Sequence, residues 1–260
     1  MPTLIFDCDG VLADTEQFGH LPAFNQLFEE EGLPLHWSVE EYAERVKIGG
    51  GKERLKSALT AEVLEKAQLP PEGPELDEIV AQWHKRKSAI YAELVHSGVM
   101  PGRPGIKRIV EEAHANGWRL AVASTSAESS VRAVLLHAVG EQLASQFKVY
   151  AGDIVPAKKP APDIYLYALE DMGVSESDAV VVEDSRNGLR AAHAAGMPTV
   201  VTVSSFTGDE DFSEASLVVS SLGEPAEDIR AEVLANPLAL EIDGGVTLTH
   251  LEQIRGSYSA

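Results

Sequence analysis

Several kinds of residue are scarce in this chain, and each shortage excludes a class of protein. A single cysteine, Cys8, allows no internal disulfide and suits a reducing compartment, so we expect a cytoplasmic protein. Only 21 Lys and Arg stand against 41 Asp and Glu, and the net charge of −20 disfavours nucleic acid and anionic membranes as partners. No apolar run approaches a membrane span, and the first residues lack the basic and apolar segments of a signal peptide.

The remaining composition is that of an ordinary globular protein. Of the 260 residues, 44% are hydrophobic and 24% are charged, so the chain can bury one large core or two unequal ones. In so acidic a chain, places where basic residues gather stand out as possible anion sites. We expect a monomer whose partner is a small molecule.

The first expected strand ends in two aspartates. The apolar residues 4–6 lead into Asp7 and Asp9, and residues two apart in an extended strand point to the same side. Gly10 then allows a sharp turn. Like charges held this close are unfavourable unless a cation lies between them or one keeps a proton. On these residues alone, a solvated acidic turn is an equally good interpretation.

Residues 16–96 carry helical patterns. Ser38 and Glu41 have the spacing of a capping box, and residues 75–96 form the longest expected helix. Lys87 falls on the apolar stripe of this last helix. It either extends to the rim of the helix, which is the more common behaviour, or points into a cleft to meet an anion.

A glycine run interrupts this helical region. Residues 49–51 are all glycine, and Lys52 and Arg54 follow at the expected start of a helix. Exposed backbone N–H groups and cations at a helix start suit a phosphate. The alternative interpretation is a flexible hinge with solvated charges.

From about residue 97 the pattern changes. Gly and Pro cluster between residues 98 and 105, and then strands and helices alternate, which predicts a parallel, doubly wound, three-layer α/β fold. Ligands of such sheets bind at the carboxyl ends of the strands. The expected strands are 4–6, 120–123, 147–151, 179–182 and 199–203, and the expected helices are 106–115, 131–139, 163–172 and 187–195.

Charged and polar residues follow these strands. Ser124 comes directly after the second strand, Glu183 and Asp184 after the fourth, and Lys159 precedes a helix between the third and fourth. With the two aspartates of the first strand, one sheet edge collects four carboxylates, a hydroxyl and a lysine. Carboxylate oxygens suit Mg²⁺, which keeps some waters and reaches a phosphate oxygen, and a lysine adds a second cation for that phosphate.

These residues resemble the motifs of the haloacid dehalogenase-like superfamily. Four motifs occur in order: Asp7-x-Asp9-Gly10-Val11, Ser124 after an apolar strand, Lys159-Pro160-x-Pro162-Asp163, and Glu183-Asp184-Ser185. The resemblance covers residues 3–222. It implies a Rossmann-like core formed by residues 1–15 and 97–222, with a helical cap inserted at 16–96. Residues 223–260 do not match the family pattern, and we treat them as a C-terminal extension that could be a lid, an oligomer contact or a mobile end.

The same resemblance implies a role for each motif residue. Asp7 would be the nucleophile that forms an aspartyl-phosphate, and Asp9 the general acid and base. The implied Mg²⁺ ligands are Asp7, the main-chain carbonyl of Asp9, Asp184 and, beside them, Glu183. Ser124 and Lys159 would bind the transferring phosphoryl group.

A closer resemblance is to the CbbY-type phosphatases. It is carried by Thr15-Glu16 with Gly19-His20 and Ala23-Phe24-Asn25, by the stretch from Lys47 to Arg54, and by the stretch from Ala151 to Pro156. Those of photosynthetic organisms remove a phosphate from xylulose-1,5-bisphosphate, so the resemblance implies this activity, and the plastid stroma if the host is a photosynthetic eukaryote. The residues expected to contact the substrate are Glu16, His20, Tyr42, Gly50, Gly51, Lys52, Arg54 and Lys87 in the cap, and Thr125 and Ser126 in the core.

Other functions remain open at this point. A β-phosphoglucomutase-like phosphomutase uses the same core but returns the phosphoryl group to the sugar. A phosphatase for another sugar phosphate would share every motif. A non-catalytic sugar-phosphate-binding module is disfavoured because all the catalytic motifs are present, and a dehalogenase has no use for Asp9 or a Mg²⁺ site.

Overall fold

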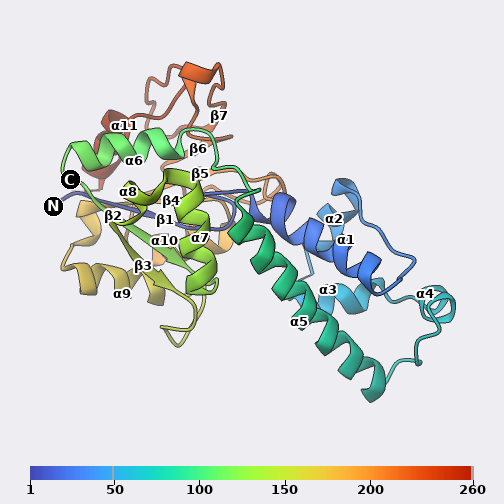
Figure 1. Cartoon of the computed structure of the whole chain (residues 1–260). Coiled ribbons are helices and arrows are strands. Elements are labelled where there is room, and N and C mark those ends of the chain that lie inside the picture. The colour runs from blue at the N-terminus through green and yellow to red at the C-terminus, as the bar shows by residue number, and fades with distance from the viewer. Residues whose placement is uncertain (49, 259–260) are drawn as a thin grey trace. The chain divides into compact units, whose positions relative to one another are not determined.

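The computed structural model describes residues 1–48 and 50–258, which fall into two compact units (Figure 1). The core unit combines Met1–Asp14 with the chain from Met100 onward, and the helical unit is Thr15–Val99. The chain therefore passes between them twice, after Asp14 and after Val99. The cap expected at 16–96 falls within the helical unit. Among the described residues, no helix combines the length and apolar character needed to cross a bilayer.

One sheet organises the core unit. Its strand order is β3-β2-β1-β4-β5-β6-β7, and all pairs are parallel except β6 with β7. The strands are β1 Thr3–Phe6, β2 Arg119–Ser124, β3 Phe147–Ala151, β4 Ala179–Glu183, β5 Thr199–Thr202, β6 Leu217–Val219 and β7 Val233–Ala235. Leu4, Ile5 and Phe6 of β1 are fully buried, as a strand covered on both faces requires. The predicted doubly wound parallel core is confirmed.

Helices cover both faces of this sheet. The helices of the core unit are α6 Ile106–Ala115, α7 Glu128–Val139, α8 Glu141–Ala144, α9 Asp163–Met172, α10 Arg186–Ala194 and α11 Leu248–Ser257, with short 3-10 turns η2 Glu176–Asp178 and η3 Pro225–Glu227. Helices α9 and α10 pack together on one apolar layer, while α6 contacts α7 and α11 (Figure 1). In α6, the buried residues Ile106, Ile109, Val110 and Ala113 have the spacing of one helix face.

Residues beyond 222 are built into the core unit. β7 pairs antiparallel with β6, and α11 buries Leu251 and Ile254 against α6 and β4. The guanidinium of Arg108 donates to three carbonyls, those of Leu222 (3.0 Å), Gly223 (2.8 Å) and Val246 (2.9 Å). The segment that the sequence analysis separated as an extension therefore completes the sheet and one of its covering layers.

The helical unit contains η1 Glu16–His20, a single π-helical turn, and α1 Leu21–Glu30, α2 Val39–Arg45, α3 Gly51–Ala58, α4 Ala61–Lys66 and α5 Pro74–Ser97. The predicted capping box opens α2: Glu41 N–H donates to Ser38 Oγ, and Ser38 N–H to the Glu41 carboxylate. Phe24 of α1 lies at the centre of an aromatic cluster with Phe28, Trp37 and Tyr42. This cluster is the core on which α1 and α2 pack.

Candidate active site

The strand order brings the predicted site residues to one place. β1 lies between β2 and β4, and Phe6 is in register with Val122 and Val182. The next residue of the first strand is Asp7, and the neighbouring strands end at Ser124 and Glu183. Because parallel strands end at the same edge, the residues that follow them converge there.

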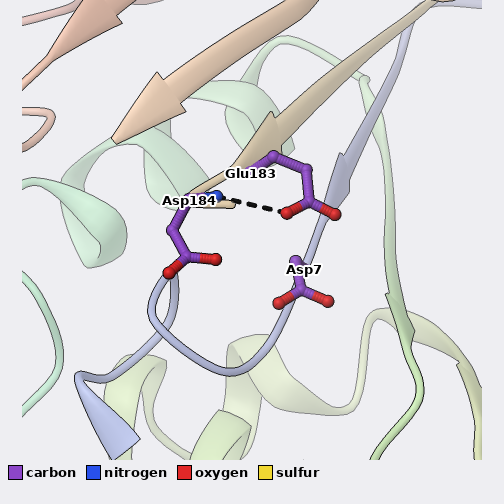
Figure 2. A group of neighbouring side chains, drawn as sticks. All are labelled: Asp7, Glu183 and Asp184. Atoms are coloured by element: carbon purple, nitrogen blue, oxygen red, sulfur yellow. Dashed lines mark hydrogen bonds between the residues drawn. The ribbon is translucent and has the colours of Figure 1, made fainter. Parts of the chain in front are cut away.

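Three carboxylates form a buried cluster at this edge, Asp7, Glu183 and Asp184 (Figure 2). One oxygen from each lies within 4.8 Å of the others, and the three residues are 7%, 0% and 7% exposed. The main chain approaches them closely at Gly10, which has a φ of 78°. A Cβ there would lie 2.0 Å from Asp184 Oδ2, so only glycine fits.

Lys159 is the cation of the cluster. Its Nζ donates to Asp7 Oδ1 (2.6 Å), to the Ala123 carbonyl (2.9 Å) and to Glu183 Oε1 (2.7 Å). The loop between β3 and α9 delivers this side chain, as the sequence predicted. Its three donors are all used by these partners.

The single positive charge of Lys159 does not neutralise the buried carboxylates, and the pKa values of Asp7 and Asp184 are raised. Burial raises the pKa of Asp7 to about 7; Lys159 opposes the shift, and Glu183 and Asp9 add to it. Burial and the charges of Glu183 and Asp7 raise the pKa of Asp184 well above its usual range. Burial alone would lower the pKa of Lys159, but Asp7 and Glu183 raise it well above normal. A bound cation would relieve this excess of negative charge.

The donor set fits Mg²⁺. Mg²⁺ prefers oxygen ligands and is usually held by one or two carboxylates together with water and phosphate oxygens. The cluster offers carboxylate oxygens alone, and the glycine at position 10 lets the Asp184 carboxylate lie directly against the main chain. The neighbouring Cys8 is buried, and burial raises the pKa of its thiol, so it remains a neutral core residue.

Asp9 and the serines form the outer part of the site. Asp9 is half-buried, and Ser126 Oγ donates to its Oδ2 at 2.5 Å. Ser124 is buried, and its Oγ accepts a hydrogen bond from Ser126 N–H at 3.1 Å. Thr125 between them is exposed. Ser126, which the sequence analysis expected to contact the substrate, thus holds the carboxylate of Asp9.

Family comparison agrees with this geometry. Residues 1–196 match the model of the haloacid dehalogenase-like hydrolases. The chain belongs to this family.

Within this family, the chain is similar to CbbY proteins. The chain is 45% identical to a CBBY-like protein of Arabidopsis thaliana, over 86% of this chain and 70% of that protein, and 43% identical to the plasmid CbbY protein of Cupriavidus necator, over 90% of each. A crystal structure of a CbbY variant from Rhodobacter sphaeroides with xylulose-1,5-bisphosphate matches at 37% identity with a TM-score of 0.67, over 85% of this chain and 94% of that one. This member of the haloacid dehalogenase-like family is a CbbY-type phosphatase.

In the helical unit, three predicted substrate residues form one hydrogen-bonded group. The Tyr42 hydroxyl donates to Glu16 Oε2 (2.6 Å), and Arg54 Nη1 donates to Tyr42 Oη (2.5 Å) and to Glu16 Oε2 (3.3 Å). Arg54 is only 8% exposed, and its guanidinium lies over the Phe24 and Tyr42 rings. The group therefore has an internal ion pair and a fixed shape.

Two further predicted residues pair beside it. Lys87 Nζ lies 2.5 Å from His20 Nδ1 and 4.4 Å from the centre of the Phe24 ring, and the side chain is buried. His20 in turn stacks on Tyr91, with ring centres 4.0 Å apart. The interpretation that Lys87 extends to the rim of its helix is wrong, because aromatic and imidazole partners accept its ammonium inside the unit.

The glycine run opens α3. Gly50 has a φ of 91°, and a Cβ on Gly51 would lie 2.7 Å from the His84 ring, so this segment packs tightly on α5. Lys52 is exposed. Gly49, which belongs to the predicted run, lies outside the described residues.

Sequence reasoning missed two residues that support the site. The Tyr165 hydroxyl donates to Glu183 Oε1 at 2.6 Å. The Arg103 guanidinium donates to the carbonyls of Gly10, Thr202 (2.8 Å), Val203 (2.6 Å) and Ser220 (2.7 Å). The only sequence signal for either was position: a tyrosine soon after the lysine motif, and an arginine within the glycine and proline cluster.

We expect Arg103→Ala to destabilise the core unit. The change leaves four main-chain carbonyls without their charged donor, and an unpaired buried acceptor costs about 1–3 kcal/mol. Water reaches some of them, so we expect the unfolding temperature of the core unit to fall by roughly 5–15 °C. Differential scanning calorimetry measures it. Arg132→Ala, which removes an exposed arginine paired with Glu128, is the control and should shift it by no more than about 2 °C. An equal shift in both variants would contradict the expectation.

Proposed function

We propose that this enzyme is a Mg²⁺-dependent phosphatase that removes one phosphate from xylulose-1,5-bisphosphate through an aspartyl-phosphate on Asp7. The observation that supports it most is the juxtaposition of Asp7, Lys159 and the Glu183–Asp184 pair at one sheet edge. The CbbY variant crystallised with xylulose-1,5-bisphosphate supports the choice of sugar.

Asp7 is the proposed nucleophile. Its carboxylate stands at the end of β1, held by Lys159 on Oδ1. Attack of a carboxylate oxygen on phosphorus forms the phospho-enzyme and splits one difficult step into two. Lys159 and the Ser124 hydroxyl then stabilise the equatorial phosphoryl oxygens, where charge is concentrated. The carboxylates of Asp7 and Asp184 and the Asp9 carbonyl, with Glu183 beside them, would hold Mg²⁺, which supplies further charge for the phosphate.

Asp9 is the proposed proton carrier. In its protonated form it gives a proton to the departing sugar oxygen and then takes one from the water that attacks the phospho-enzyme. The hydrogen bond from the Ser126 hydroxyl fixes Oδ2 of this carboxyl and so orients the group that would transfer the proton. Proton transfer from a positioned side chain of this kind contributes about 10²–10⁴-fold to rates.

The second phosphate of a bisphosphate needs its own cations. In a protein with a net charge of −20, the basic residues of the helical unit are the proposed ones, Lys52, Arg54 and Lys87. Burial lowers the pKa of His84, and the charges of Lys87 and Lys52 lower it further. Cationic side chains bind phosphate oxygens with charge-assisted hydrogen bonds.

A phosphate-release screen tests the proposed function. The purified enzyme is assayed with Mg²⁺ on a panel of sugar monophosphates and bisphosphates, and the sugar product is identified by mass spectrometry. We expect the highest kcat/KM with xylulose-1,5-bisphosphate, one free phosphate per turnover and no regenerated bisphosphate. Regeneration of a bisphosphate would instead identify a phosphomutase, and a clear preference for another sugar would replace the proposed substrate.

Lys52→Ala tests the second-phosphate site. Loss of one charge-assisted contact costs about 1.5–3 kcal/mol, so kcat/KM on a sugar bisphosphate should fall roughly 10- to 150-fold. On a small aryl phosphate, which has no second phosphate, it should stay within about twofold. Arg54→Ala should also lower kcat/KM more on the sugar bisphosphate than on the aryl phosphate. Its kcat/KM should fall further than that of Lys52→Ala on both substrates, since Arg54 also holds Glu16 and Tyr42.

The matched control is Lys56→Ala. Lys56 is an exposed lysine four residues further along α3, and it pairs with Asp77. The Lys56→Ala variant should leave kcat/KM unchanged on both substrates. If Lys52→Ala lowers kcat/KM equally on both substrates, the glycine run is a structural element and the second phosphate binds elsewhere.

A further inference from the structure

The Tyr165 hydroxyl reaches the active site from inside the core. Tyr165 lies in the first turn of α9 and is fully buried, and its Oη donates to Glu183 Oε1 at 2.6 Å. The Tyr165 ring also lies against the site, since Lys159 Nζ is 4.9 Å from the ring centre. A buried tyrosine needs a partner for its hydroxyl, and here that partner is a charged group of the proposed site.

The Glu183 carboxylate is fixed on every side. Oε1 accepts from both Tyr165 and Lys159, and Oε2 accepts from the Asp184 N–H at 3.2 Å (Figure 2). Behind it lies Gly188, where a Cβ would be 2.0 Å from the carboxyl atoms. Glu183 is 0% exposed, so no rotation to solvent is open to it. With two donors on Oε1, Oε2 is the oxygen that remains for a cation.

Lys159 is not sufficient as the only hydrogen-bond donor to Oε1 of Glu183. It shares its three donors among Asp7, Ala123 and Glu183, and in the proposed reaction it must also reach the phosphoryl group. When a donor of Lys159 turns to the substrate, Tyr165 is the donor to Oε1 that does not depend on the substrate. The carboxylate then keeps its orientation through the reaction.

We propose that Tyr165 is a positioning residue, whose hydroxyl holds Oε1 of Glu183 so that the other oxygen stays directed at Mg²⁺. The proposal rests on the proposed function, because it assumes the Mg²⁺ site. Partners that orient metal-binding side chains in this way are typically worth about 10- to 100-fold in metal affinity or activity.

Tyr165→Phe tests the proposal, because it removes one oxygen and keeps the ring. The full-length enzyme without substrate is titrated with Mg²⁺ in a calorimeter, and the dependence of its unfolding temperature on Mg²⁺ gives a second measure of the same affinity. We expect the dissociation constant for Mg²⁺ to rise about 10- to 100-fold. Phosphate release should fall at low Mg²⁺ and recover to within about threefold of the unmodified enzyme at saturating Mg²⁺.

The matched control is Tyr167→Phe. Tyr167 lies two residues further along α9, is 44% exposed and packs its ring on Tyr150. Its variant should bind Mg²⁺ within about twofold of the unmodified enzyme. A Tyr165→Phe enzyme with unchanged Mg²⁺ affinity, even at a lowered unfolding temperature, gives the hydroxyl a structural role only and overturns the proposal. Activity that stays low at saturating Mg²⁺ overturns it as well. An unmodified enzyme that binds no Mg²⁺ would instead refute the metal in the proposed function.

Discussion

Asp7→Asn should abolish phosphate release, with a loss of more than about 10⁴-fold in kcat. The amide cannot attack phosphorus, and removal of a covalent nucleophile leaves only the catalysis that binding and charge stabilisation provide. Steady-state phosphate release with a sugar phosphate at saturating Mg²⁺ measures the loss. Activity of the unmodified enzyme should likewise disappear in excess chelator. Turnover at the normal rate in either experiment would contradict the proposed mechanism.

The same variant should fold at least as well as the unmodified enzyme when metal is absent. Burial raises the pKa of Asp7 from an ordinary 3.8 to about 7, so the folded state holds this proton more tightly than the unfolded state does. The stability due to that proton is full below about pH 4 and is lost as the pH rises toward 7. Asparagine has no proton to lose and stays neutral at every pH of the experiment, and its Oδ1 can still accept a hydrogen bond from Lys159. In chelator at pH 8, we therefore expect an unfolding temperature equal to or above that of the unmodified enzyme, and a marked fall would mean that the lost activity reflects misfolding.

The ends of the strands were the part of the site most open to sequence reasoning. A buried parallel strand has a continuous apolar run, and the residue after it must emerge at the edge where its neighbours also end. That rule alone places Asp7, Ser124 and Glu183 at one edge, and the structure brings them there. Lys159 was also expected at this edge, because its loop follows the third strand of the sheet.

Side chains whose partners are distant in sequence were not predictable in this way. Lys87 is 67 residues from His20, and nothing in the pattern of its own helix indicates that an imidazole and an aromatic ring will receive its ammonium. The Tyr165 hydroxyl is a similar case, since helical spacing predicts a buried ring but not the direction of its oxygen. Tertiary packing decides both.

Short elements also gave too little signal. β6 and β7 have three residues each, which is shorter than the window over which alternation can be recognised. The segment from 223 onward did not match the family pattern and was separated as an extension, although its backbone completes the sheet through β7 and its helix α11 contacts β4. Besides these contacts, the Arg108 guanidinium holds the carbonyls of Leu222, Gly223 and Val246, and such hydrogen bonds leave no periodic trace in the sequence.

Asp9→Asn should slow turnover of a sugar phosphate by about 10²–10⁴-fold, while Asp7 can still take up one phosphoryl group. The change keeps Asp7, the main-chain carbonyl at position 9 and an oxygen for the Ser126 hydroxyl, and it removes only the transferable proton. An aryl phosphate with an acidic phenol needs little help to leave, so with that substrate the phospho-enzyme should form and accumulate, because the water that must attack it has lost its base. Acid-quenched samples examined by intact-mass spectrometry would show one added phosphoryl group on the variant.

Asp153→Asn, which changes an exposed carboxylate paired with Lys158, is the control and should turn over normally. Normal turnover by Asp9→Asn itself would assign Asp9 a purely structural place beside the metal site.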